Sequence, residues 1–176
     1  MLNALESVVP DLGRQRPKAA RDVDWEVIRQ LLGVGLPSDY KELAGSYPAF
    51  GVDDFLCVHI PRIGGEESFC NGIREDLEML TDLVDADMAH GYVAHPGPNG
   101  LVPCASSLSG DVFYWRVSGP DPDRWPIVVS GRDDDWWEFP GGLVAFLTAW
   151  LGGTMERHGL PRNVPSPEPR VRLFRD

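Results

Sequence analysis

The chain has 176 residues, of which 43% are hydrophobic, and it carries a formal net charge of −11. A chain of this size can bury the core of one domain without cross-links, and its three cysteines form no C-x-x-C pair typical of zinc or redox sites. The acidic charge repels phosphate groups, which argues against nucleic-acid binding, membrane adhesion and anionic substrates. No apolar run is long enough for a signal peptide or a membrane span, so we expect a cytoplasmic protein.

The negative charge is unevenly distributed along the chain. Residues 154–176 hold five arginines against three acids, a local balance of +2, which leaves −13 for residues 1–153. Between Glu75 and Trp115 there are seven acidic residues and no lysine or arginine. A surface of this kind would attract a basic partner.

Two short helices are expected near the start of the chain. The first lies between Asp22 and Gly33, with Asp22 or Asp24 as its N-cap, because apolar residues recur there at helical spacing. The second follows Pro37, with Ser38 as its candidate cap. The apolar run 55–60 then predicts a strand, closed by proline and two glycines.

The second half of the chain predicts a longer helix, a group of strands and a final helix. The helix is expected over residues 71–88. Four short apolar runs, LVPCAS, VFYWRV, PIVVS and WWEF, are then separated by glycine, proline and aspartate, which is typical of an antiparallel meander. The run GGLVAFLTAWLGG predicts the closing helix, and the proline-rich tail is expected to wrap the surface in extended form or to be loose.

Catalytic and metal-binding patterns are weak in this sequence. The run Asp133, Asp134 and Asp135 lacks the alternating ligands of a calcium loop, so a polar hairpin turn is favoured over a metal site. None of the four histidines lies in a recognisable catalytic setting, and there is no nucleophile elbow or phosphate loop. We therefore expect no enzyme activity, no cofactor and no metal.

The dipeptide Trp136-Trp137 lies in an expected strand, where consecutive side chains point to opposite faces. One of the two indoles should therefore lie in the core. The other would either be exposed beside the aspartates as an anchor for a basic partner, or be covered by a helix next to a solvated turn.

Two segments resemble the SUKH superfamily, which groups bacterial immunity proteins with yeast regulators of cell-wall synthesis. The first, residues 24–61, has a short helix, a Leu-Pro-x-x-Tyr entry to a second helix, then glycine and a strand. The second, residues 110–153, has a Gly-Asp strand with tryptophan, a Trp-Pro-Ile-Val-Val strand, and a short strand leading into a final helix. The matching positions, which read as structural rather than functional, are Leu36, Pro37, Tyr40, Gly51, Trp115, Trp125 and Pro126.

The resemblance implies a single α+β domain with a largely antiparallel sheet packed by helices. It places the SUKH-like domain at residues 22–153, between an N-terminal extension (1–21) and a proline-rich tail (154–176). Such bacterial proteins bind and block a cognate toxin, frequently a nuclease, and they share no catalytic constellation.

The sequence therefore predicts an immunity protein that neutralises a basic toxin domain through an acidic surface. A nuclease holds phosphates with lysine and arginine, so carboxylates of an inhibitor can occupy the same cleft. The alternative is a regulatory or scaffold module that binds a cellular protein. The residues expected to bind the partner are Asp133, Asp134, Asp135, Glu138, Trp136 and Trp137, with Asp53 and Asp54 as a second patch.

Overall fold

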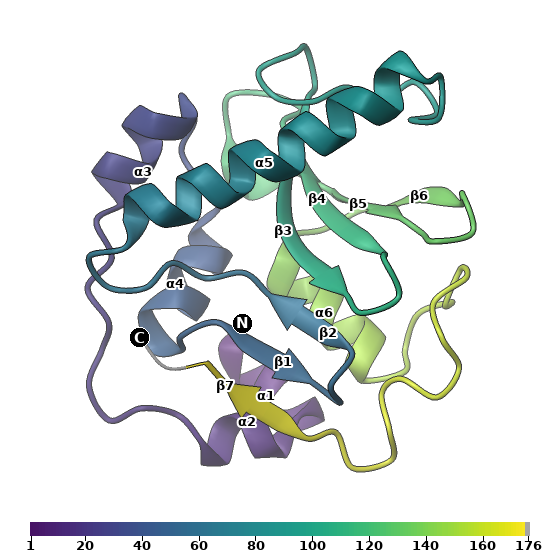
Figure 1. Ribbon diagram of the computed structural model, residues 1–176. Helices are drawn as coiled ribbons and strands as arrows, with labels where there is room; N and C mark the ends of the chain where they lie inside the picture. The colour runs from purple at the N-terminus through teal and green to yellow at the C-terminus, as the bar shows by residue number, and fades with distance from the viewer. Residues whose placement is uncertain (175–176) are drawn as a thin grey trace.

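A seven-stranded sheet with strand order β6-β5-β4-β3-β2-β1-β7 runs through the molecule (Figure 1). The computed structural model describes residues 1–174. Every pair of neighbouring strands is antiparallel. The predicted meander is confirmed, because β3 to β6 are consecutive neighbours. The strands are β1 (Phe50–Val52), β2 (Leu56–Val58), β3 (Leu101–Ser107), β4 (Val112–Arg116), β5 (Ile127–Ser130), β6 (Trp136–Phe139) and β7 (Val171–Leu173).

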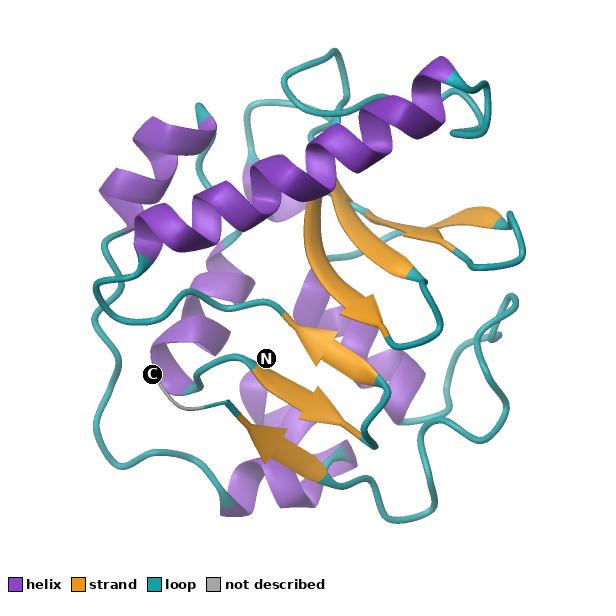
Figure 2. Ribbon diagram, in the orientation of Figure 1, coloured by secondary structure: helices purple, strands orange, loops and turns teal. Residues whose placement is uncertain are grey.

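Helices cover both faces of this sheet, which confirms the predicted α+β class. In Figure 2 the longest helix, α5, crosses in front of the sheet, while α1, α4 and α6 lie behind it. The helices are α1 (Leu2–Val8), α2 (Pro10–Arg14), α3 (Trp25–Leu32), α4 (Ser38–Ser46), α5 (Glu66–Asp85) and α6 (Leu143–Leu151), with a 3₁₀ turn, η1 (Pro122–Arg124).

The apolar side chains form two clusters, one on each face of the sheet. The main core contains the largest buried rings, among them Trp115 and Tyr40, whose ring centroids are 4.8 Å apart in an edge-on arrangement. The smaller cluster lies beneath α5 and includes Leu80, Tyr114 and Val128. The strands therefore bury residues on both faces.

Capping residues and apolar spacing in the sequence predicted the positions of most helices correctly. Asp24 caps α3, since its carboxylate accepts from the backbone N–H groups of Glu26 and Val27 at 3.1 Å, and Gly33 ends the helix at a φ of 74°. The prediction that Ser38 caps α4 is wrong, because the N-cap is Pro37, and the N–H of Ser38 itself donates to Oδ1 of Asp123 at 2.6 Å.

One predicted helix begins at a different residue in the structure, and one strand was not predicted at all. Helix α5 begins at Glu66, five residues before the predicted start, where Glu66 and Glu67 lie favourably in its first turn. Strand β1 was not predicted, because three residues containing a glycine carry no readable alternation.

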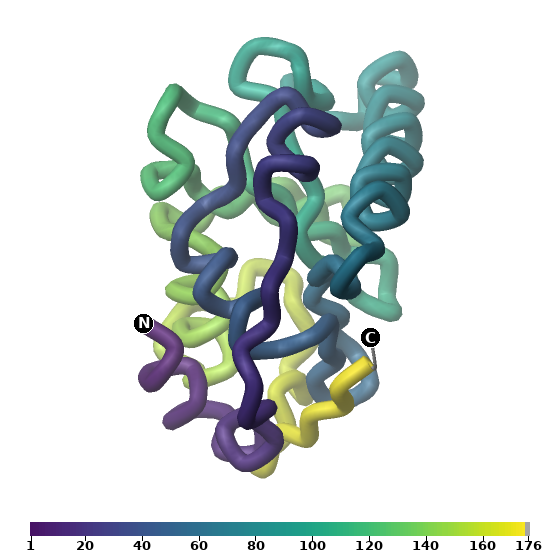
Figure 3. Tube along the Cα trace, turned by 90° about the vertical axis from the view of Figure 1, so that its left-hand side faces the viewer, coloured from purple at the N-terminus to yellow at the C-terminus, as the bar shows by residue number. Residues whose placement is uncertain are grey.

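Both ends of the chain contribute to the same core. Leu2, Leu5 and Leu12 are buried in it, and Val171 of the tail is buried where β7 pairs with β1. The tail was expected either to wrap the surface in extended form or to be loose, and up to residue 174 the structure shows it packed against the rest of the protein. Figure 3 shows that residues 15–24 run extended along one side of the molecule, between the N-terminal helices and α3.

Candidate functional site

The aspartate run forms the turn of the β5–β6 hairpin. The N–H of Gly131 donates to the C=O of Asp135 at 2.8 Å, and the N–H of Asp134 donates to the C=O of Gly131 at 3.1 Å. Asp134 has a φ of 65°, the left-handed conformation with which a three-residue hairpin loop ends. Aspartate tolerates this conformation better than most residues, so the hairpin turn accounts for an aspartate at this position.

The three aspartate side chains point in different directions. The side chain of Asp133 is 73% exposed, with its nearest cation the Arg132 guanidinium at 3.4 Å. Asp134 is also exposed, and its Oδ1 lies 3.0 Å from Nε2 of His90. Asp135 is half-buried, and its carboxylate lies against Gly159 of the tail, where a β-carbon would collide with it.

These carboxylates do not converge on a point where an ion could bind. Within residues 1–174, no three or more histidine, cysteine, aspartate or glutamate side chains are grouped so that they could hold a metal ion. Asp133 and Asp134 instead present negative charge to solvent at the tip of the hairpin.

Trp136 lies on the face of the sheet that carries α5. Its ring stacks on Tyr92 at a centroid distance of 5.2 Å and on Tyr114 at 6.3 Å, and the ring of His90 lies 6.2 Å away. The indole is half-buried at the margin of the smaller cluster. It is therefore partly covered, by the rings of Tyr92 and Tyr114, and partly exposed beside the acidic turn.

Trp137 points to the opposite face, as the alternation of the strand predicts. It packs against the main core, 6.1 Å from the ring of Phe146, and His158 of the tail covers it at 4.9 Å. Its indole N–H is buried and makes no hydrogen bond within residues 1–174. Trp137 is thus the core member of the pair.

Glu138 shares the face of Trp136. Its Oε1 accepts from the hydroxyl of Tyr92 at 3.1 Å, and its Oε2 accepts from Nη2 of Arg116 at 2.9 Å. Burial, followed by the charge of Glu138, raises the pKa of Tyr92, so this hydroxyl remains a donor at neutral pH. The ion pair is partly exposed and contributes little to stability.

His90, Tyr92 and Arg116 belong to this surface, although the sequence did not single them out for it. The loop after α5 brings His90 and Tyr92 against β6, 44 and 46 residues away from their partners in the chain. No local pattern indicates that contact. The hairpin surface is defined by seven residues: Asp133, Asp134, Trp136, Glu138, His90, Tyr92 and Arg116.

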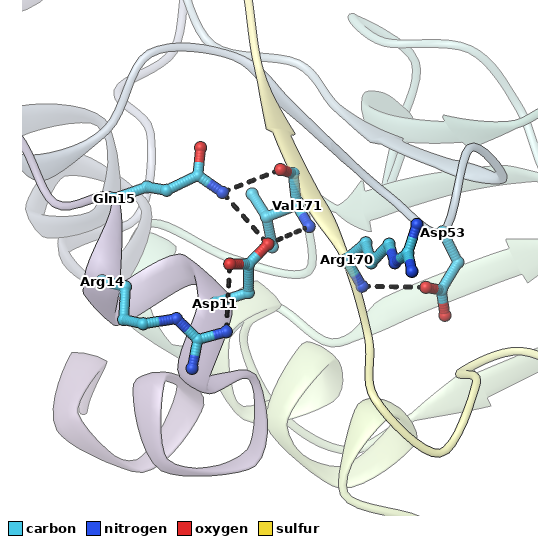
Figure 4. A network of polar contacts seen from close by, with 6 residues as sticks. All are labelled: Asp11, Arg14, Gln15, Asp53, Arg170 and Val171. Carbon is cyan, nitrogen blue, oxygen red and sulfur yellow. Dashed lines mark hydrogen bonds and ion pairs between the residues drawn. The ribbon is translucent and has the colours of Figure 1, made fainter.

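The second predicted patch lies in the β1–β2 turn and its two aspartates differ. The carboxylate of Asp53 accepts from the N–H of Ser166 at 2.6 Å, from the Ser166 hydroxyl at 3.0 Å and from the N–H of Arg170 at 2.9 Å. Asp53 therefore holds the tail (Figure 4). Asp54 is exposed. Of this patch, it is Asp54 that presents its carboxylate to solvent.

The structure does not join the two patches. Strand β6 is one edge of the sheet, and β1 is five strand positions away. At about 4.8 Å for each position, this corresponds to roughly 24 Å across the sheet. The two patches are therefore separate surfaces, and the hairpin surface, which combines carboxylates with the partly exposed ring of Trp136, is the stronger candidate site.

Other polar groups in the protein have structural tasks. Asp39 is buried and accepts from the N–H groups of Val144 and Tyr40 at 3.0 and 2.7 Å, which caps the start of α6. Burial raises its pKa. His59 lies 2.9 Å from the hydroxyl of Ser106, and burial lowers its pKa, which favours a neutral ring.

The comparisons with known proteins found no match. No protein-family model matches the chain, and no curated protein or solved structure is significantly similar to it. The resemblance to the SUKH superfamily therefore stays a prediction. Within residues 1–174, no helix is both long and apolar enough to cross a membrane.

Proposed function

We propose that this chain is a cytoplasmic, non-enzymatic protein of the SUKH type that binds and neutralises a basic toxin domain through the hairpin surface. The observation that carries the proposal is the pairing of a partly exposed indole with solvent-facing carboxylates on one hairpin. Trp136 supplies apolar contact area, and Asp133, Asp134 and Glu138 supply negative charge. Buried aromatic anchors ringed by polar groups are typical of protein interfaces.

The charge of the whole molecule supports the same partner. A net charge of −11 would steer a basic domain towards the protein, and this attraction falls with salt. An indole face also attracts lysine or arginine, so the same partner side chain can contact Trp136 and pair with a neighbouring acid. A nuclease, whose cleft must hold phosphates, is the toxin class that fits best.

The proposal is tested by co-expression with the C-terminal domain encoded by the neighbouring gene. We expect that this domain kills cells alone, that the protein restores growth, and that the two form a salt-sensitive complex. Charge reversal at Asp133, Asp134 and Glu138 together should weaken the complex at least 100-fold at low salt. Reversal at Glu67, Glu75 and Glu78, three exposed acids of α5, is the matched control for net charge.

Two results would contradict the proposal in different ways. Toxicity without rescue would point to the regulatory or scaffold module. Rescue by the triple charge-reversal variant, with unchanged affinity, would move the interface away from the hairpin surface.

A further inference from the structure

Strand β6 is an edge of the sheet, and some of its backbone groups have no hydrogen-bond partner within residues 1–174. The N–H of Gly131 donates to the C=O of Asp135, so these two residues form a hydrogen-bonded pair at the turn. Hydrogen-bonded and non-hydrogen-bonded pairs alternate along an antiparallel ladder. Trp136 and Glu138 therefore lie in non-hydrogen-bonded pairs with β5. Their N–H and C=O groups point away from β5, and nothing in residues 1–174 bonds them.

At the other edge of the sheet, the chain itself bonds the outward groups of one residue of β7, Val171. The outward N–H of Val171 in β7 donates to Oδ2 of Asp11 at 2.8 Å, and its C=O accepts from Nε2 of Gln15 at 2.8 Å (Figure 4). Exposed edge strands template pairing with other chains, and proteins usually block them. An edge left open beside a candidate binding surface is therefore a place where a partner can add a strand.

We propose that β6 binds an extended basic segment of the partner as an added antiparallel strand. This inference rests on the proposed function, because it takes the partner to be a basic protein. Trp136 and Glu138 offer two N–H donors and two C=O acceptors, which an added strand would satisfy. The antiparallel direction follows the rest of the sheet.

The two faces of β6 define the side chains that such a segment needs. One face carries Trp136 and Glu138 with Asp134 near them, and the other carries Trp137 and Phe139, both half-buried against the main core. Residues directly opposite each other in a ladder share a face. The segment should therefore alternate basic residues, opposite Trp136 and Glu138, with apolar residues on the side of Trp137.

A second copy of this chain is a poor occupant of the same edge. Two β6 strands paired about a two-fold axis would bring the carboxylates of Glu138 and Asp134 from both copies together. Each copy also carries a net charge of −11. Like charges across a ladder are destabilising, so the charge favours a basic segment.

The test uses an acetylated and amidated hexapeptide in which lysine and valine alternate, added to the full chain at low salt. We expect salt-sensitive binding, with slower hydrogen exchange at the amides of Trp136 and Glu138. In an antiparallel ladder the lysine amides face β6 and the valine amides face solvent. N-methylation of the lysine amides should therefore weaken binding at least tenfold, and N-methylation of the valine amides less than twofold.

A pair of protein variants tests the other side of the ladder. Glu138→Pro removes the outward N–H, whereas Glu138→Ala removes only the carboxylate. Proline is tolerated on an edge strand whose N–H faces solvent. We expect the peptide to bind Glu138→Pro about tenfold more weakly than Glu138→Ala.

Two results would overturn strand addition. One is no binding of the hexapeptide. The other is salt-sensitive binding that both methylated peptides reproduce equally, which would leave the acidic hairpin surface, and with it the proposed function, in place. The co-expression experiment decides the proposed function separately, since rescue does not require an added strand.

Discussion

The two edge strands of the sheet, β7 and β6, differ in whether their outward-facing backbone N–H and C=O groups form hydrogen bonds. At β7 the outward groups of Val171 are bonded by Asp11 and Gln15, side chains of the N-terminal segment. At β6 the outward groups of Trp136 and Glu138 lack such partners within residues 1–174. An acid near β7, Asp11, thus bonds the strand edge, whereas Asp133 and Asp134 before β6 are exposed at the tip of the hairpin.

Removal of the tail should have the largest effect on this comparison. A chain that ends at Pro165 loses β7, the buried side chain of Val171 and the bonds that Asp53 and Asp11 accept. We expect the free energy of unfolding to fall by about 3 kcal/mol, from apolar burial and lost hydrogen bonds. Urea denaturation measures it. Arg172→Ala, an exposed change within β7, should cost less than about 0.5 kcal/mol.

Proline substitutions compare the two edges directly. Val171→Pro removes a donor that Asp11 uses, and we expect it to cost about 1.5 kcal/mol more than Val171→Ala. Glu138→Pro removes a donor that bonds nothing in the free protein, so its stability should lie within about 0.5 kcal/mol of Glu138→Ala. Thermal or urea denaturation would show this. Equal costs at both edges would refute the contrast.

Asp53 and Asp54, neighbours in the β1–β2 turn, allow an acid that bonds the tail to be compared with one that is exposed. Asparagine keeps the positive φ of both positions but weakens acceptance from the tail at Asp53. We expect Asp53→Asn to lower the free energy of unfolding by about 1 kcal/mol and Asp54→Asn to leave it unchanged. If Asp54→Asn were the more destabilising variant, the assignment of Asp53 as the tail anchor would be wrong.

Low pH should weaken the hydrogen bonding at the β7 edge, and this is the smallest of the four expected effects. The bond from Val171 N–H, followed by Arg14, lowers the pKa of Asp11 below its usual 3.8. A lowered pKa means that the carboxylate stabilises the fold above pH 3.8 and loses this contribution as the pH falls through the folded pKa. The NMR methyl signals of Val171 should shift over that range. Asp11→Asn should remove this pH dependence, and an unchanged titration in that variant would exclude Asp11 as the cause.

Most of the fold could be predicted from local patterns. The alternation in the runs that became β3 to β6, the cap at Asp24 and the glycine at Gly33 each act through neighbours in the sequence. Strand β1 could not be predicted, because its three residues are held by pairing with β2 and with the distant β7.

The sequence by itself determined that Trp136 and Trp137 lie on opposite faces, because side chains alternate along any strand, and that acids crowd the turn before them. Only the tertiary structure decided which indole is core, that Asp53 bonds a tail more than 110 residues away, and that Tyr92 lies beside Glu138. Those contacts depend on long-range strand pairing and helix packing. A local pattern specifies which face a residue occupies but not what lies against that face.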